Sequence, residues 1–328
     1  MGIVQEVTDK FPFDEAPQVL RRQEELLLAD PLPGPVKLWQ DQSPLEAVHF
    51  PQAYRPQKFA PPRGVYESDH IRIEWQTMDD SRQPFYHRNC DADELSYQVW
   101  GERTLMTELG SLEHVPGDFS RIPVGVAHDN YGRQESHLLF YIPAPVEERQ
   151  RAVRTSELRI PPFPGWQAAT VNELVTECLG APGHDVAIFP SDERLLLEQA
   201  ERDTARIQIL RADDSGPETT WLYRSAQVWI GRTLLGASGG REYRRHRNSD
   251  EIQYQISGRR TLVTQRGALH LEPGDFVRIP VGVAFASVSS EQSAHITLVS
   301  AHAVPQVAAA SKKAERVAVQ EIDSLRRG

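Results

Sequence analysis

Apolar and polar residues alternate in short runs between Asp69 and Tyr141, as in HIRIEW and RTLMTEL. Such alternation is typical of strands that bury one of their two faces. The runs are separated by turn residues, which are Gly101, Gly110, Pro116, Gly117 and Pro123. Closely spaced strands with turns between them predict a β-sandwich or a small β-barrel. The same signals return from Trp221 to Val299, so we expect a second domain of this kind.

A helical spacing of apolar residues appears outside these two regions. TVNELVTECLG and SDERLLLEQAERD predict helices in a connector, and the second helix should begin near Ser191. The tail from Ser311 to Leu325 predicts a charged amphipathic helix. The first 62 residues are rich in proline and have no sustained period, although QVLRRQEELLLA suits a short helix. We interpret them as an arm that packs on the body of the protein or on a neighbouring subunit.

These patterns predict an all-β protein of five segments. They are an N-terminal arm (1–62), a first β-domain (63–145), a helical connector (146–218), a second β-domain (219–304) and a C-terminal helix (305–328).

The two β-domains contain copies of one module. Glu94–His128 aligns with Glu251–Phe285 at a constant offset of 157 residues, with no gap and with 21 of 35 positions identical. The last aligned pair is His128 and Phe285, so the histidine at this position is present only in the first copy. This difference indicates that the two copies have different functions.

Composition and charge exclude several classes of protein. The 328 residues have room for two domains of ordinary size, and no apolar run approaches the roughly 20 residues that span a bilayer. The net charge of −10 argues against a nucleic-acid partner. With only Cys90 and Cys178, the chain has no disulfide framework, which favours a reducing, cytoplasmic location. We therefore expect a small-molecule substrate, no nucleic acid and no membrane.

The first copy offers a metal-ligand set on neighbouring predicted strands. The segments FYHRNCDADE and GDFSRIPVGVAHDN contain His87, Glu94 and His128. Two histidines and one carboxylate leave open positions on a metal, an arrangement that suits non-haem Fe(II). Asn89 lies two residues after His87, so in a strand both side chains point to the same side. We expect Asn89 to bind the substrate or a ligand rather than the metal.

These segments resemble the motifs of the cupin superfamily. Gly117, Pro123, Gly125 and His128 match the spacing of the family's second motif, and Glu94 and Gly101 match part of the first. Asn89 replaces the second histidine of the first motif, and the upstream glycine is absent. The resemblance implies a bicupin, with two β-barrels of jelly-roll type.

The string YHRN followed by an acidic residue is similar to the active-site segment of the homogentisate 1,2-dioxygenase family. That resemblance implies that His87, Glu94 and His128 hold Fe(II), and that O2 and a small aromatic or phenolic acid are the substrates. The family keeps its iron in the C-terminal cupin and has five residues between His and Glu, against six here. The resemblance also implies a homo-oligomer whose subunits pair through their N-terminal arms, as in other bicupins.

The second copy can be aligned with the first in two ways around the histidines. At the fixed offset His87 aligns with Arg244 and Asn89 with His246, whereas a shift of two residues aligns HRNCDADE with HRNSDE. In both alignments one histidine and one glutamate remain. We therefore expect the C-terminal cupin to hold no metal and to have a structural role.

Residues near the motif that occur only in the first copy are further candidates for the active site. We name Asn130, Tyr131 and Trp100 together with Asn89 as catalytic candidates. Tyr97, Gln98 and Arg121 recur in the second copy and therefore belong to the scaffold.

Two classes of function remain open. The first is an Fe(II)-dependent dioxygenase that cleaves an aromatic ring. The second is a non-redox cupin with Mn(II) or Zn(II), an isomerase, lyase or hydrolase, and a weaker third is a metabolite-binding module. A Lewis-acid enzyme also needs a positioned proton-transfer group. The sequence near the motif shows no further histidine or carboxylate for this role, which favours the dioxygenase.

Overall fold

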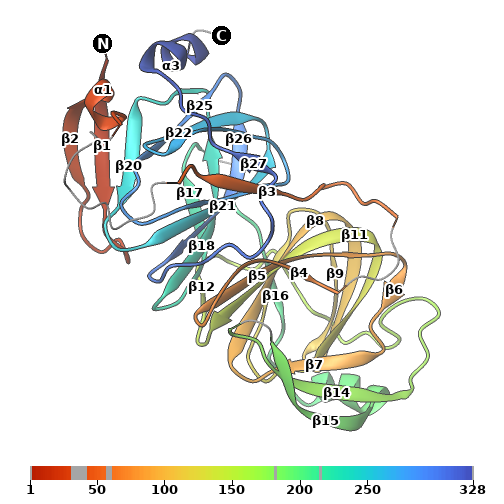
Figure 1. Cartoon of the computed structure of the whole chain (residues 1–328). Helices are drawn as coiled ribbons and strands as arrows, with labels where there is room; N and C mark the ends of the chain where they lie inside the picture. Colours follow the sequence, from red (N-terminus) through yellow and green to blue (C-terminus); the bar gives the residue numbers. More distant parts are fainter. Residues whose placement is uncertain (1, 31–42, 57–60, 181–182, 214–215, 327–328) are drawn as a thin grey trace.

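The computed structural model describes residues 2–30, 43–56, 61–180, 183–213 and 216–326, and these form two β-barrels that lie against each other (Figure 1). The all-β, two-barrel fold expected from the repeated module is confirmed. Among the described residues, no helix is long and apolar enough to cross a membrane.

The first barrel is one continuous sheet of twelve strands, because two of its strands are 16 residues long and run through both walls of the barrel. These long strands are β8 (Ala92–Thr107) and β11 (His128–Pro143). The others are β4 (Arg63–Ser68), β5 (Ile71–Met78), β6 (Ser81–Arg82), β7 (Phe85–Asn89), β9 (Gly110–His114), β10 (Phe119–Ile122), β13 (Arg154–Thr155), β14 (Thr170–Glu177), β15 (His184–Asp192) and β16 (Gln208–Leu210).

The second barrel is made of two sheets, because the strands that correspond to β8 and β11 are interrupted. The eight-stranded sheet contains β12 (Glu147–Glu148), β17 (Thr219–Arg224), β18 (Val228–Leu235), β26 (Ser293–Ser300), β21 (Asp250–Ser257), β24 (Asp275–Ile279), β3 (Glu46–His49) and β27 (Lys312–Lys313). The seven-stranded sheet contains β2 (Gln18–Gln23), β1 (Ile3–Asp9), β20 (Glu242–His246), β25 (Phe285–Ser289), β22 (Arg260–Thr264), β23 (Gly267–Leu271) and β19 (Ser238–Gly239).

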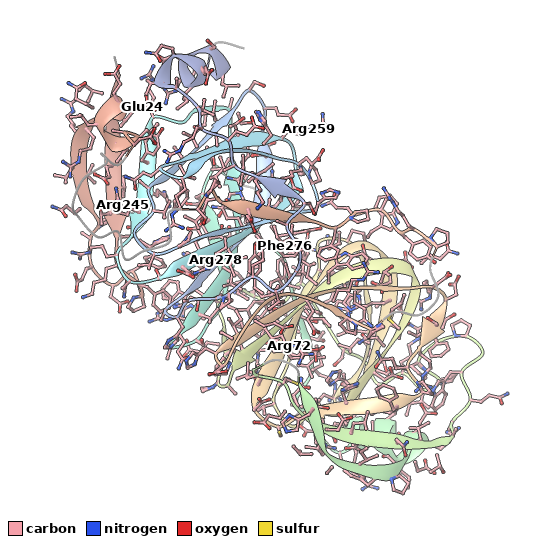
Figure 2. All side chains as sticks on the ribbon, viewed as in Figure 1. Glu24, Arg72, Arg245, Arg259, Phe276 and Arg278 are labelled. Carbon is pink, nitrogen blue, oxygen red and sulfur yellow. The ribbon has the colours of Figure 1, made fainter. Side chains whose placement is uncertain are left out.

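The two barrels share one hydrophobic core, which contains buried residues from both. Alternate residues of β11 face opposite ways, so Leu138, Phe140 and Ile142 enter this core. Phe276 of β24 lies at the junction of the barrels and contacts Tyr254, with 4.6 Å between the ring centroids (Figure 2). Because the outer faces of the sheets are joined here, the interiors of the two barrels are kept on opposite sides of the junction.

Each barrel is extended by a hairpin that joins its edge in parallel. The hairpin β14–β15 pairs with β7, and the hairpin β1–β2 pairs with β20. A short helix follows each hairpin, namely α2 (Glu193–Glu198) with the 3₁₀ turn η1 (Gln199–Glu201) and α1 (Glu24–Leu27). The N-terminal arm therefore packs on the C-terminal barrel (Figure 1), while its residues 31–42 and 57–60 lie outside the described part of the chain.

The prediction of two helices in the connector is wrong in part. Thr170–Glu177 is strand β14, since it pairs on one side with β7 and on the other with β15, and its many β-branched residues suit this environment. The second expected helix is present as α2, where the Asp192 carboxylate accepts a hydrogen bond from the backbone N–H of Leu195. We also expected helices at 18–29 and 311–325. Each of these segments begins with a strand and ends with a helix, and the second helix, α3, is limited to Val319–Leu325.

Candidate metal centre

The three proposed ligands lie on three strands of the first barrel. His87 in β7 pairs directly with His128 at the start of β11, and Glu94 in β8 pairs with Tyr141 further along β11. In the second barrel Arg244 pairs with Phe285 in the same way. The structure thus selects the alignment at the fixed offset, in which Arg244 takes the place of His87 and His246 that of Asn89.

Glu94 and His128 converge on a point inside the barrel. His128 Nε2 lies 3.1 Å from Glu94 Oε2, and each residue is 4% exposed. His128 Nδ1 lies 3.0 Å from the carbonyl oxygen of Val126, so an Nδ1–H donor there leaves Nε2 free to bind a metal. Two donors that bind one ion at about 2.1 Å and at right angles lie about 3 Å apart. The pair therefore has the spacing that two ligands of one metal need.

Asn89 lies beside this pair and belongs to the same cluster. Its Nδ2 donates to Glu94 Oε2 at 3.1 Å, and its Oδ1 accepts from the thiol of Cys178 at 3.1 Å. Asn89 is buried, with 2% exposed. With both ends of the amide engaged, Asn89 orients the carboxylate of Glu94, and the amide oxygen does not face the metal position.

In the absence of a metal, Glu94 and His128 have the charges of an ion pair. Burial raises the pKa of Glu94, but the charge of His128 and hydrogen bonds from His128 and Asn89 outweigh it and lower the pKa to about 2. Burial lowers the pKa of His128, and the attraction of Glu94 more than offsets this, so the pKa of His128 lies above its ordinary value. A metal at this position must therefore displace a proton from His128.

His87 faces the pair but is turned partly away from it. The rings of His87 and His128 are 6.2 Å apart between centroids and 30° from parallel, and Thr176 Oγ1 lies 3.4 Å from His87 Nδ1. Burial and the nearby His128 lower the pKa of His87 to about 4, so its ring is neutral, as a ligand must be. The three donors do not all lie within 4.8 Å of one another as placed. His87 needs a side-chain rotation to complete a three-ligand site.

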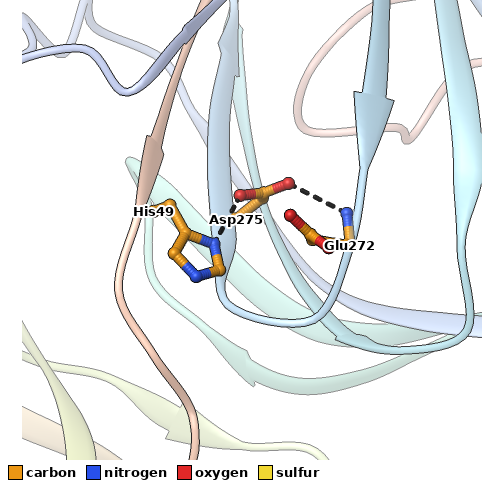
Figure 3. Close-up of side chains that lie close together, drawn as sticks. All are labelled: His49, Glu272 and Asp275. Carbon is orange, nitrogen blue, oxygen red and sulfur yellow. Dashed lines mark hydrogen bonds and ion pairs between the residues drawn. The ribbon is translucent and has the colours of Figure 1, made fainter.

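Among the described residues, one trio does bring its donors within 4.8 Å, and it lies in the second barrel. His49, Glu272 and Asp275 meet where β3 runs beside the turn before β24 (Figure 3). The ammonium group of Lys312 already occupies this place, at 2.8 Å from Glu272 Oε1 and 2.6 Å from Asp275 Oδ2. A metal ion would have to displace that ammonium group, so we assign the trio to the scaffold.

The first barrel supports this assignment. Asp118, which aligns with Asp275, is likewise buried and paired with the cationic side chains of Arg154 and Arg211. In both barrels a buried aspartate after a Pro-Gly turn is thus neutralised by basic side chains from a neighbouring segment.

The other catalytic candidates are not brought to the ligand cluster. The Oδ1 of Asn130 accepts a hydrogen bond from Arg103 at 3.2 Å rather than from a member of the cluster. Tyr131 faces outward, because it is three residues from His128 on one strand, and it stacks on Phe163 at 4.1 Å between centroids. Trp100 is 49% exposed on the surface. The structure thus places neither Tyr131 nor Trp100 beside Glu94 and His128, and a catalytic role for either stays a prediction from the sequence.

Sequence reasoning missed a second group of ionisable residues on the interior face. Glu74 of β5 pairs with Leu139 of β11, and Tyr141 two residues further on pairs with both Arg72 and Glu94. The sequence signal was the alternation in HIRIEW, which places Arg72 and Glu74 on one face. The register that turns this face toward Glu94 depends on long-range strand pairing, which the alternation alone does not specify.

Some solved structures are similar to this chain, which consists of two all-β barrels, each with one copy of the repeated module. No family model and no curated protein matches the sequence. Similar solved structures include a cupin 2 conserved barrel domain protein from Leptotrichia buccalis, with 10% identity and a TM-score of 0.47 over 75% of this chain and 92% of that one.

An oxalate decarboxylase structure is similar with 13% identity and a TM-score of 0.48, over 82% of each chain. A mutant of the Bacillus subtilis oxalate decarboxylase OxdC is 13% identical with a TM-score of 0.46, over 80% of this chain and 79% of that one. Similarity at this level leaves the reaction open. The resemblance to the homogentisate dioxygenase family stays a prediction from the sequence.

Proposed function

We propose that the first barrel is a metal-dependent active site that catalyses non-redox proton transfer, as an isomerase or lyase, on a small oxygen-bearing molecule. One observation carries the proposal: a second buried carboxylate, Glu74, shares the interior face with Glu94. Its Oε1 pairs with Arg72 at 2.7 Å, while its Oε2 has no hydrogen-bond partner in the described part of the chain. Glu74 would supply the proton-transfer group whose apparent absence from the sequence favoured the dioxygenase.

The donor set fits a divalent metal of the first transition row. Glu94 and His128 would hold it, and His87 would join them after rotation, as imidazole and carboxylate ligands suit Mn, Fe and Zn. The bound ion would act as a Lewis acid that polarises an oxygen atom of the substrate.

Glu74 is suited to hold or move a proton at Oε2. Burial raises its pKa, and this effect exceeds the opposite effect of Arg72, so the pKa of Glu74 lies above its ordinary value. A carboxyl group with a raised pKa exchanges protons more readily near neutral pH than an ordinary carboxylate. Arg72 also lies over the ring of Tyr141, at 4.9 Å from the centroid, and so fixes one side of this interior face.

The second candidate function is an Fe(II)-dependent dioxygenase that acts on a small aromatic acid. The specific observation that favours it is the set of two histidines and one carboxylate, together with the YHRN resemblance. The two candidates differ in their need for O2, and this difference decides between them.

The test combines metal analysis with two assays on the purified protein. Proton transfer is followed by NMR as solvent deuterium exchange into a panel of small hydroxy and oxo acids. Oxygen uptake is followed by an electrode with catechols and with gentisate-like and homogentisate-like acids. We expect exchange without oxygen uptake, and stoichiometric oxygen uptake without exchange would refute the proposal and support the dioxygenase.

Three variants assign the residues. Glu94→Gln should abolish metal binding, and Glu74→Gln should retain the metal but lose at least about a hundredfold in the exchange rate. Glu251→Gln, the matched change in the second barrel, should keep both. Undiminished exchange by Glu74→Gln would remove Glu74 from the mechanism.

A further inference from the structure

The second barrel, which we expected to be only structural, contains a cavity of about 480 Å³. This is the size of pockets that hold small molecules, about 300 to 1,000 Å³. Its walls include residues from the barrel interior, such as Glu251, Gln253 and Thr297, and aromatic residues at the mouth, Phe13 and Trp221.

The cavity exists because small residues replace the large ones of the first barrel. By strand pairing, Gly231 takes the place of Glu74, and Thr297 and Val299 take those of Leu139 and Tyr141. A side chain at Gly231 would also collide with the backbone oxygen of Thr220 at 2.5 Å, so the replacement cannot be reversed without moving β17. The hollow is therefore specified by the sequence of the second copy.

Polar residues that line this hollow form a hydrogen-bond network that is incomplete. Glu251 accepts hydrogen bonds from His246 Nε2 at 2.6 Å and from Gln253 Nε2 at 2.5 Å. The Nδ1 atoms of His246 and His295 are buried and find no hydrogen-bond partner among the residues that the structure describes. The histidines are 6% and 3% exposed, respectively. Buried polar atoms without partners cost free energy, which a ligand can recover.

A row of hydroxyl groups continues this polar surface. Thr233 Oγ1 lies 2.8 Å from Thr219 Oγ1 and 2.5 Å from Thr297 Oγ1. Hydroxyl groups both donate and accept, so the row can adapt to a ligand that carries hydroxyl groups of its own.

The charges around the cavity disfavour an anionic ligand. Asp9, Glu218 and Glu242 lie at its wall together with Arg244, so an anion meets an excess of acidic groups. Burial and the nearby Arg260 and Arg244 hold the pKa of His295 well below its ordinary value, so its ring is neutral and offers a hydrogen bond rather than a charge. Burial raises the pKa of Glu251, but hydrogen bonds from His246 and Gln253 lower it more, so the carboxylate stays ionised and accepts hydrogen bonds.

The mouth of the cavity is formed by the N-terminal arm. Phe13 stacks on Trp221 with 5.9 Å between centroids and 20° between planes, and it also faces His246 at 5.8 Å. The backbone of Phe13 has φ of 68°, a left-handed conformation that is strained for a residue with a side chain. The neighbouring Phe11 is held by two hydrogen bonds with the amide of Asn248. An aromatic platform at the mouth is thus fixed in place at a cost in strain.

We propose that the cavity of the second barrel binds an uncharged ring compound with hydroxyl groups, whose flat face stacks on Phe13 and Trp221 and whose hydroxyl groups bond to Glu251, His295 and the threonine row. Two chemical sources share these properties, a phenol and a pyranose sugar, and the probes below distinguish them. The proposal goes beyond the function assigned to the first barrel and does not depend on it.

Binding is measured on the full chain by calorimetry and by tryptophan fluorescence, since Trp221 lines the cavity. The neutral probes are catechol and methyl glucoside, and the charged probes of similar size are benzoate and benzylamine. The test variant is Thr297→Leu, which introduces the residue that the first barrel has at this place. The control is Leu298→Ile, whose side chain faces the core between the barrels.

We expect one neutral probe to bind with a stoichiometry of one, and Thr297→Leu to weaken it by about tenfold or more. Leu298→Ile and the metal-site variant Glu94→Gln should bind as the wild type does, so the inference and the proposed function fail separately. If Thr297→Leu does not fold, Thr233→Val keeps the shape, removes one hydroxyl group and should weaken binding about threefold to tenfold.

Three results would overturn the inference: no neutral probe binds, a charged probe binds more tightly than both neutral ones, or the folded variant binds with unchanged affinity.

Discussion

Replacing His87 with glutamine should make the metal-free protein markedly more resistant to acid. In the folded chain the pKa of the His87 side chain is lowered from 6.5 to about 4, chiefly by burial. Between these two values the unfolded chain binds a proton at His87 and the folded chain does not, so the free energy of unfolding falls as the pH falls. A lowering of the pKa by about 2.5 changes the free energy of unfolding by at most about 3 kcal/mol. At about pH 5 the loss should be about 2 kcal/mol, and at about pH 7 it should be close to zero.

The assay is urea denaturation of the metal-free wild type and of His87→Gln at about pH 7 and about pH 5. Other buried histidines also respond to acid, so the informative quantity is the difference between the two proteins. The wild type should lose about 2 kcal/mol more than the variant over this range. His184→Gln is the matched control, because the side chain of His184 is 64% exposed. Equal losses in wild type and His87→Gln would show that His87 is not held neutral by its surroundings.

Three further changes test the metal centre and the packing. Zn²⁺ uptake at about pH 7 should release protons to an indicator dye, because His128 must lose the proton that it shares with Glu94. The variant Glu94→Gln should neither take up the metal nor release protons. Phe276→Ala should lower the free energy of unfolding by about 3 to 5 kcal/mol in urea denaturation, since it leaves a cavity between the barrels, and a value below about 1 kcal/mol would contradict this packing. Arg326→Met should cost about 3 to 5 kcal/mol because it leaves the buried carboxylate of Glu24 unpaired, and the added change Glu24→Gln should restore part of the loss.

The sequence predicted what depends on local pattern and on the repeat. Alternation and turn residues predicted the strands of both barrels. The motif spacing selected Glu94 and His128, which the structure places 3.1 Å apart. Their proximity depends on the pairing of β8 with β11, which the resemblance to known motifs implies but the local pattern does not specify.

The failures of prediction concern long-range pairing. TVNELVTE has apolar residues at a helical spacing, but β7 on one side and β15 on the other provide hydrogen-bond partners that stabilise a strand. Glu74 shares a face with Glu94 only because β5 pairs with β11. The cavity of the second barrel likewise depends on three substitutions, at Gly231, Thr297 and Val299, that come together only in the folded chain.

The hairpin at the N-terminus has a consequence for the order in which the protein can assemble. The first barrel and its hairpin β14–β15 are continuous in sequence, so this half can complete itself while the chain is still being synthesised. The second barrel needs a hairpin that is made long before it, and Phe11 meets Asn248 across a separation of 237 residues. The strands β1 and β2 can pair with each other, but the other edge of β1 must wait until β20 has been made. The aromatic mouth of the second cavity is completed only by that last docking step, so a chain that has lost its N-terminal hairpin would keep the first site and lose the second.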